Sequence, residues 1–339
     1  MKFAEIIGQE RPIRVLQQAK RTGKLAHAYL FAGPPGVGKM TTARAFAAAL
    51  NCLAGGEDAC GVCASCHKMA QGNHPDYFEI SRDDERTGIV IEQVRAVIKS
   101  AQRRPYESRF QVFIFDQAET MTTEAANALL KTLEEPTADN VFVLVTPAPH
   151  QLLPTVASRC QMVRFGPLAE EDLRRLIQER MSLSDEDATL VAALADGSLG
   201  RAENMPLDFL KTTRLEIFTQ LAEADGDQPV QALSLGAKLK EAADDLRTVI
   251  ELLGGFVRDA AVWRSSGDAR RLRHRDALPL IERYAAGHEV KDLLGKIRAL
   301  VYARRLVERN VNKDAIVDGL CLELLAAGPT TFARGRLPR

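Results

Sequence analysis

A glycine-rich turn between a strand-like run and a helical run constrains the fold of this chain most strongly. Residues 28–32 read AYLFA, an apolar run typical of a buried strand, and residues 33–39 read GPPGVGK. An alanine-rich helical segment, Thr41–Leu50, comes next. This context matches the P-loop, in which backbone N–H groups at a helix start surround phosphate oxygens. The candidate nucleotide-binding residues of this loop are Gly33, Gly36, Gly38, Lys39 and Thr41.

The position after Lys39 departs from this motif. A P-loop carries serine or threonine there, whose hydroxyl binds magnesium, but this chain has Met40. A thioether is a poor ligand for that hard cation, and Thr41 lies about 100° further around the helix. Phosphate binding can therefore persist while magnesium-assisted hydrolysis is weakened. ATP or ADP stays a candidate ligand of a degenerate site.

An acidic residue at the end of a second strand is also part of this candidate nucleotide site. Residues 112–115, VFIF, form another apolar strand, and Asp116 follows where a Walker B carboxylate holds magnesium. The next residue is Gln117, whose neutral amide can orient water but cannot accept its proton. Losing a general base lowers the rate about 10²- to 10⁴-fold. Glu119 lies two residues further on, and we do not expect its side chain to point where that base would.

The order of strand-like and helical runs predicts the fold class. Between Ala28 and Cys160, apolar runs such as AYLFA, QVFIFD and NVFVLVT alternate with helical stretches. Strands that are apolar along their whole length are typical of a parallel sheet covered by helices on both faces. After Gly166 strand-like runs end and helical spacing dominates. Two apolar stripes that predict packed helices there are Leu246, Val249, Ile250, Leu253 and Val257, and Ile316, Leu320 and Leu324.

Breaks in this pattern divide the chain into parts. We expect an α/β P-loop domain at 1–166, a small helical domain at 167–205 and an all-α C-terminal domain at 206–330, followed by a flexible basic tail at 331–339. Gly197, Ser198 and Pro206 mark the second boundary, because glycine and proline end regular elements.

Four of the six cysteines lie close together in the sequence. Cys60, Cys63 and Cys66 form two overlapping Cys-x-x-Cys steps, and Cys52 precedes them. Four sulfur ligands suit a closed tetrahedral zinc site, which is structural because no coordination position stays open. His67 is the alternative fourth ligand if Cys52 points away. The segment 52–66 therefore predicts a structural Zn²⁺ module.

Composition limits the other possibilities. Lysine plus arginine and aspartate plus glutamate number 45 each, so no overall field draws the chain to nucleic acid or membrane. The N-terminus lacks the apolar core of a signal peptide, and no run approaches a membrane span, which predicts a cytoplasmic protein. A local basic group with Tyr106 among its members lies at a helix end before a strand, where such charges are normally solvated or cap backbone carbonyls. Its members are Lys99, Arg103, Arg104 and Arg109.

Five stretches in series carry a family resemblance. They are HAYLFAGPPGVGK from His27, NHPDYFEI from Asn73, IEQVR from Ile91, EAANALLKTLEEP from Glu124 and LLPTVASRC from Leu152. In this order they resemble the clamp-loader branch of the AAA+ family, and within it the delta-prime type of the bacterial DNA polymerase III clamp loader. The resemblance implies that the P-loop domain is an AAA+ domain with an inserted zinc module, that 167–205 is a lid and that 206–330 is a collar domain.

The resemblance also implies roles for single residues. The arginine matching Arg159, in Ser158-Arg159-Cys160, reaches the ATP held by a neighbouring subunit. An arginine supplied in this way contributes about 10³- to 10⁵-fold in rate. A nucleotide-sensing polar residue matches Thr146 or Pro147, and a second sensor arginine matches Arg201 with an uncertainty of one residue.

The function implied is that of a scaffold subunit. AAA+ ATPases usually carry glutamate where this chain has Gln117, and the gamma or tau motor subunits keep both residues that Met40 and Gln117 replace. We expect a delta-prime subunit without independent ATPase activity. Its expected partners are gamma/tau and delta subunits, the sliding clamp indirectly and primer-template DNA within the assembly, with no membrane. A gamma/tau-type ATPase motor is the alternative, and a zinc-dependent protein that binds nucleic acid alone is a third class.

Overall fold

The protein is described by a computed structural model over residues 1–82, 88–224, 229–241 and 246–325. Two compact units make up this chain. The first contains Met1–Leu183 and Ala195–Asn204, and the second contains Ser184–Leu194 and the described residues from Met205 onward. The tail predicted at 331–339 lies outside the described residues. The sequence-based boundaries at 166 and 205 stay predictions.

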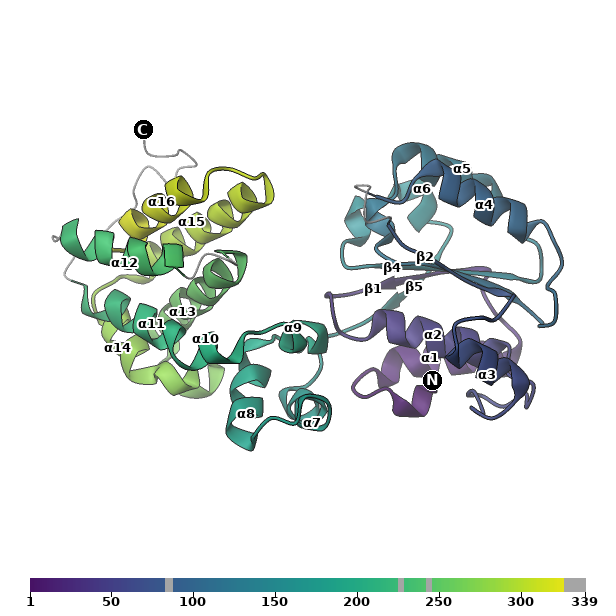
Figure 1. Ribbon diagram of the computed structural model, residues 1–339, viewed down its shortest axis with the longest axis horizontal. Helices are drawn as coiled ribbons and strands as arrows, with labels where there is room; N and C mark the ends of the chain where they lie inside the picture. Colours follow the sequence, from purple (N-terminus) through teal and green to yellow (C-terminus); the bar gives the residue numbers. More distant parts are fainter. Residues whose placement is uncertain (83–87, 225–228, 242–245, 326–339) are drawn as a thin grey trace. The chain divides into compact units, whose positions relative to one another are not determined.

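A five-stranded parallel sheet forms the centre of the first unit (Figure 1). Its strand order is β2-β3-β4-β1-β5, so the P-loop strand β1 lies between β4 and β5. Leu30 on β1 pairs with Leu144 on one side and with Met162 on the other. The strands are β1 (Ala28–Ala32), β2 (Tyr77–Ile80), β3 (Gln111–Phe115), β4 (Asn140–Thr146) and β5 (Gln161–Arg164).

Alternate strand residues enter two separate cores because successive side chains point to opposite faces of a sheet. Tyr29 and Phe31 belong to one buried cluster, whereas Leu30 belongs to the other. On the second face the rings of Phe78, Phe113 and Phe142 stack across three strands, with centroid distances of 4.9 and 5.2 Å. Both faces of the sheet are therefore buried, as the apolar strand runs predict.

Helices cover both faces of the sheet (Figure 1). One face carries α1 (Glu10–Thr22), α2 (Lys39–Leu50) and α3 (Ala64–Ala70), and the other carries α4 (Ile91–Ala101), α5 (Thr123–Glu134) and α6 (Pro154–Ala157). This unit also contains α7 (Glu170–Met181), α9 (Leu199–Glu203) and the short 3-10 helices η1 (Phe3–Glu5), η2 (Ala118–Thr120) and η3 (Pro149–Gln151). The predicted parallel sheet flanked by helices is confirmed.

The sequence did not predict the two edge strands, β2 and β5. The runs AYLFA, QVFIF and NVFVLVT are strands β1, β3 and β4, as predicted. In β5, by contrast, only Val163 is buried, and in β2 only Ile80 is. An edge strand has one neighbour and a partly exposed face, so its sequence lacks the continuous apolar run that identifies an inner strand.

The described part of the second unit is helical. Its helices are α8 (Asp185–Leu194), α10 (Leu207–Lys211), α11 (Thr213–Glu223), α12 (Pro229–Glu241), α13 (Leu246–Ser266), α14 (Leu278–Ala286), α15 (Val290–Glu308) and α16 (Lys313–Leu325), with the 3-10 helices η5 (Ala269–Arg271) and η6 (Arg275–Ala277). The longest of them, α13, packs against α14 and α15. The predicted helical C-terminal region is confirmed.

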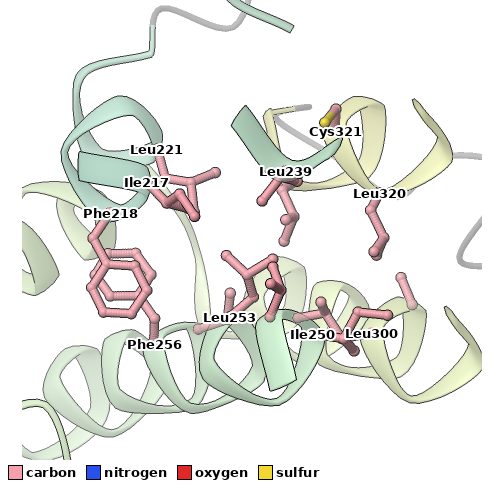
Figure 2. Packing of buried hydrophobic residues seen from close by; sticks show 14 of the residues in the cluster. Ile217, Phe218, Leu221, Leu239, Ile250, Leu253, Phe256, Leu300, Leu320 and Cys321 are labelled. Carbon is pink, nitrogen blue, oxygen red and sulfur yellow. The ribbon is translucent and has the colours of Figure 1, made fainter. Parts of the chain in front are cut away.

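One hydrophobic core holds these helices together (Figure 2). Every member of the two predicted apolar stripes is buried in it. Phe218 of α11 stacks on Phe256 of α13 with ring centroids 4.2 Å apart, and Leu239, Ile250 and Leu320 converge further along the core. The stripes are therefore packing surfaces inside this unit.

Candidate functional site

The P-loop lies between the buried strand β1 and the start of α2. Gly36 and Gly38 have positive φ angles of 70° and 96°, which residues other than glycine rarely adopt. Gly38 is also the N-cap of α2, so the first N–H groups of that helix point toward the loop. A side chain at Gly33 would collide with the carbonyl oxygen of Phe165, 2.3 Å from an added Cβ. Glycine is thus required at Gly36 and Gly38 by the backbone conformation and at Gly33 by a close contact.

Lys39 points back into its own loop. Its Nζ donates to the carbonyl oxygens of Gly33 and Pro34 at 2.7 and 2.5 Å, and only 6% of the residue is exposed. Burial lowers the pKa of Lys39 to about 8, and the charges of Glu119 and Asp116 oppose that shift. The ammonium is therefore held beside the loop, where it can meet a phosphate.

A cavity of about 500 Å³ opens beside the P-loop. The loop forms one wall, and apolar side chains including Ile6, Ile7 and Leu176 form another. Such a combination of a cationic loop and an apolar wall suits a nucleotide. The predicted site residues that line the cavity are Gly36, Gly38, Lys39, Met40, Thr41, Asp116 and Gln117.

The cavity also receives Glu119, to which sequence reasoning gave no role. Gln117 adopts a left-handed φ of 51°, and the 3-10 turn η2 then carries Glu119 to the cavity wall. Its Oε2 is buried and has no hydrogen-bond partner among the described residues. Asp116 accepts from the N–H of Gln117 at 3.0 Å. The strand end therefore presents two carboxylates to the cavity, and the turn that delivers the second has no simple sequence signal.

Helix α9 is attached directly to the P-loop. The hydroxyl of Ser198 donates to the carbonyl of Pro35 at 2.9 Å, and the N–H of Gly200 donates to the carbonyl of Gly36 at 3.2 Å. A Cβ on Gly200 would lie 3.0 Å from the Cα of Gly36, so the two backbones touch. A side chain at position 200 would therefore crowd the backbone of the P-loop.

The residues predicted as nucleotide sensors have different surroundings. Arg201 pairs with Asp196 at 3.1 Å and does not line the cavity, which is lined instead by its neighbour Gly200. Thr146 is fully buried and accepts from the N–H of Ala148 at 3.0 Å, whereas Pro147 lines the cavity. The arrangement does not bring either polar side chain to the cavity wall.

Arg159 stands apart from this cavity. It follows α6, and its Nη1 donates to the carbonyl oxygen of Thr155 at 2.8 Å. Its Nη2 lies 2.5 Å from Oε1 of Glu134 at the end of α5, and about one third of the arginine side chain (34%) is exposed. The guanidinium is thus held at the surface.

The four clustered cysteines converge, and together they could hold a metal ion. Their sulfur atoms all lie within 4.8 Å of one another. Backbone N–H groups of Val62 and Cys63 donate to the sulfur of Cys60 and lower the pKa of that thiol to about 6. The N–H of Cys60 in turn donates to the sulfur of Cys52 at 3.3 Å. His67 does not belong to this group, so the donor set is four sulfurs, which fits a tetrahedral thiophilic ion.

The NHPDYFEI stretch anchors a neighbouring loop. Asp76 is fully buried, and its carboxylate accepts from the N–H groups of Tyr106, Glu107 and Ser108 at 2.6, 3.0 and 2.9 Å. The loop therefore has a fixed backbone although the ring of Tyr106 is 84% exposed. The basic residues Arg103, Arg104 and Arg109 are exposed around it.

Replacing Asp76 by alanine should lower the free energy of unfolding of the first unit by about 3 kcal/mol. Each hydrogen bond to a charged group contributes about 1.5–3 kcal/mol, and water can reach part of the freed loop. Urea unfolding followed by circular dichroism measures the change. Glu107→Ala is the matched control, since it keeps the backbone N–H that donates to Asp76 and removes only the side-chain pairs with Lys68 and His74, so it should cost less than about 1 kcal/mol. Equal effects of the two variants would contradict the anchoring role.

Within the described ranges, no helix is both long enough and apolar enough to cross a membrane.

Comparison with known proteins places the chain in a family. The family description "DNA polymerase III, delta subunit" matches residues 8–169, and "DNA polymerase III, delta subunit, C terminal" matches residues 209–324. The DNA polymerase III subunit delta' of Bacillus subtilis is 29% identical over 322 residues, which are 93% of this chain and 96% of that protein. This chain belongs to the DNA polymerase III delta-prime family.

Tau subunits of DNA polymerase III are also similar to this chain. DNA polymerase III subunit tau of Salmonella typhimurium is 31% identical over 310 residues, which are 88% of this chain and 47% of that protein. The gamma/tau subunit of Mycobacterium tuberculosis is 37% identical over 202 residues, or 58% of this chain and 35% of that protein. The chain thus spans about half the length of the tau relatives or less.

Proposed function

We propose that this chain is a delta-prime subunit of the DNA polymerase III clamp loader, acting as a scaffold in ATP-driven loading of the sliding clamp onto primed DNA. In this proposal Arg159 enters the ATP site of a neighbouring gamma/tau subunit and stabilises charge on the terminal phosphate. A planar guanidinium suits phosphate oxygens better than an ammonium does. The likeness to the delta' relative over nearly the full length of both chains supports the assignment.

The residues that line the cavity support the proposal that this chain is a scaffold that does not hydrolyse ATP efficiently. Met40 and Gln117 line it at the positions where an active site needs a magnesium-binding hydroxyl and a general base. Arg201 pairs with Asp196 outside the cavity, so the predicted sensor arginine does not line the place where ATP would be hydrolysed. We infer that the P-loop retains affinity for ATP or ADP through Lys39 and its backbone N–H groups, with little hydrolysis.

The remaining assignments extend this proposal. The four cysteines would hold a structural Zn²⁺, with the thiolate sulfurs as its ligands. The segments 167–205 and 206–330 would serve as lid and collar. Arg103 and Arg104 would contact primer-template phosphates within the assembly, which adds affinity without reading sequence.

A gamma/tau-type ATPase motor is the second candidate. It is favoured by the tau relatives, which reach 31% identity over most of this chain. Glu119 also bears on this candidate, because it brings a second carboxylate to the cavity. The two candidates differ in one measurable property, which is turnover by the isolated chain.

The isolated chain should hydrolyse ATP at least about 10²-fold more slowly than its own gamma/tau partner, because Gln117 occupies the position where the general base is expected. Phosphate release at saturating ATP measures this rate, and binding of fluorescent ATP with and without magnesium measures affinity. We expect Met40→Thr to make binding more magnesium-dependent than in the wild type. Turnover of the isolated wild-type chain at the partner's rate would favour the motor assignment and end the scaffold proposal.

A further inference from the structure

We propose that Glu134 is a positioning residue for Arg159, holding the guanidinium in the orientation in which it meets a phosphate of the neighbouring subunit. The inference rests on the proposed function of Arg159. Glu134 comes from the EAANALLKTLEEP stretch, whose acidic end has no role in the cavity.

Two contacts fix the guanidinium at its outer end. The Nη2 atom is 2.5 Å from Oε1 of Glu134, and Nη1 donates to the carbonyl of Thr155 at 2.8 Å. One contact therefore comes from the preceding turn and the other from a residue 25 positions earlier. An arginine side chain that is contacted at both terminal nitrogens has less rotamer freedom to lose when a phosphate arrives.

The pair with Arg159 offsets an unfavourable charge at the end of α5. It is the last residue of α5, and Glu135 is the C-cap. The C-terminus of a helix carries partial negative charge, so acidic side chains are disfavoured there. A residue that breaks a local rule marks a place where tertiary contacts decide its identity. For Glu134 that contact is Arg159, which neutralises the carboxylate.

The backbones that carry the two side chains are rigidly related. Leu133 on α5 and Val156 on α6 are each 1% exposed and belong to one buried cluster. Close-packed cores keep such positions fixed to within small displacements. The distance between Glu134 and Arg159 is thus set by the core of the sheet's second face.

The pairing leaves Arg159 able to act. A guanidinium has five N–H donors, and the two contacts occupy one on each terminal nitrogen. The other three remain for phosphate oxygens, so Arg159 does not have to leave Glu134 to reach them. An exposed ion pair of this kind biases a conformation by up to about fivefold, which is too weak to sequester an arginine from a triphosphate.

The test uses the reconstituted clamp loader, assembled from this chain and its gamma/tau and delta partners, with ATP and primed DNA. We expect Glu134→Ala to lower the single-turnover rate of ATP hydrolysis at the site that Arg159 enters by about two- to fivefold with the affinity for ATP unchanged, because the arginine acts on the transition state. Glu134→Gln, which retains an acceptor oxygen, should recover part of the loss. The matched control is Glu135→Ala, which removes the same charge from the next residue and should leave that rate unchanged.

A double-mutant cycle separates positioning from general damage. In an Arg159→Ala background, Glu134→Ala should have no further effect on the single-turnover rate at the site that Arg159 enters. A full-rate Glu134→Ala variant beside a slow Arg159→Ala variant would overturn the positioning role and leave the proposed function intact. Faster turnover by Glu134→Ala, or an equal loss in both backgrounds, would also overturn it. Full-rate turnover by Arg159→Ala would instead refute the proposed function itself.

Discussion

Replacing Arg159 by alanine should slow DNA-stimulated ATP turnover of the assembled clamp loader by about 10³-fold or more at the site that this arginine enters. The expected loss is large because alanine removes a charge that acts only on the transition state of phosphoryl transfer. Steady-state phosphate release by the reconstituted complex measures it. A loader with several ATPase sites would keep the turnover of the sites that other subunits complete, so single-turnover kinetics should show one slow class of site.

Arg164→Ala provides the matched control for this prediction. Arg164 is an exposed arginine at the end of β5, in the same unit, and lies outside the pair formed by Arg159 and Glu134. We expect its removal to leave turnover unchanged. Arg159→Lys should restore little, because an ammonium lacks the planar fork of a guanidinium. Unchanged single-turnover rates in the Arg159→Ala loader would refute the arginine-finger role.

Replacing Cys66 by serine should abolish stoichiometric metal binding and destabilise the module at 52–66. Structural zinc contributes about 10–16 kcal/mol to the folding of small zinc peptides. Here the module is attached to a sheet with its own core, so we expect local opening and not global unfolding. Metal analysis should find one zinc per wild-type chain and less than a tenth of that in the variant. Limited proteolysis should then cut between residues 52 and 66.

Cys160→Ser is the control for the metal prediction. Cys160 lies after α6, outside the cluster of four sulfurs, and its Sγ contacts the carbonyl of Val156. This variant should keep its metal and its resistance to proteolysis. A wild-type protein purified without stoichiometric metal, or a Cys66→Ser variant that keeps its full complement, would contradict the zinc assignment.

Motifs formed by neighbouring residues were predictable from the sequence. The P-loop glycines, Lys39 and the replacement at Met40 lie within eight consecutive positions, from 33 to 40. Local spacing alone places them together, because a strand–turn–helix leaves few alternatives. The cysteine steps are predictable for the same reason, although Cys52 joins them only because α2 ends beside the module.

Contacts between distant segments were not predictable. The turn after Asp116 brings Glu119 to the cavity only because Gln117 takes a left-handed conformation that no sequence rule requires of glutamine. The pairing of Gly200 with Gly36 and of Glu134 with Arg159 joins residues 164 and 25 positions apart. The family resemblance made Arg201 a sensor candidate, yet its side chain pairs with Asp196 and does not line the cavity.

The sequence by itself determined the class of fold, the phosphate loop with its missing hydroxyl and the cysteine motif of Cys60, Cys63 and Cys66, because each depends on periodicity or on spacing within one element and its flanking turn. Only the tertiary structure decided which carboxylates face the cavity, how α9 touches the P-loop and what holds Arg159. Those outcomes depend on how packed cores fix segments that are remote in sequence, and packing is a property of the whole set of side chains. For this reason the chemistry of the P-loop was predictable from its sequence, whereas the orientation of Arg159 was not.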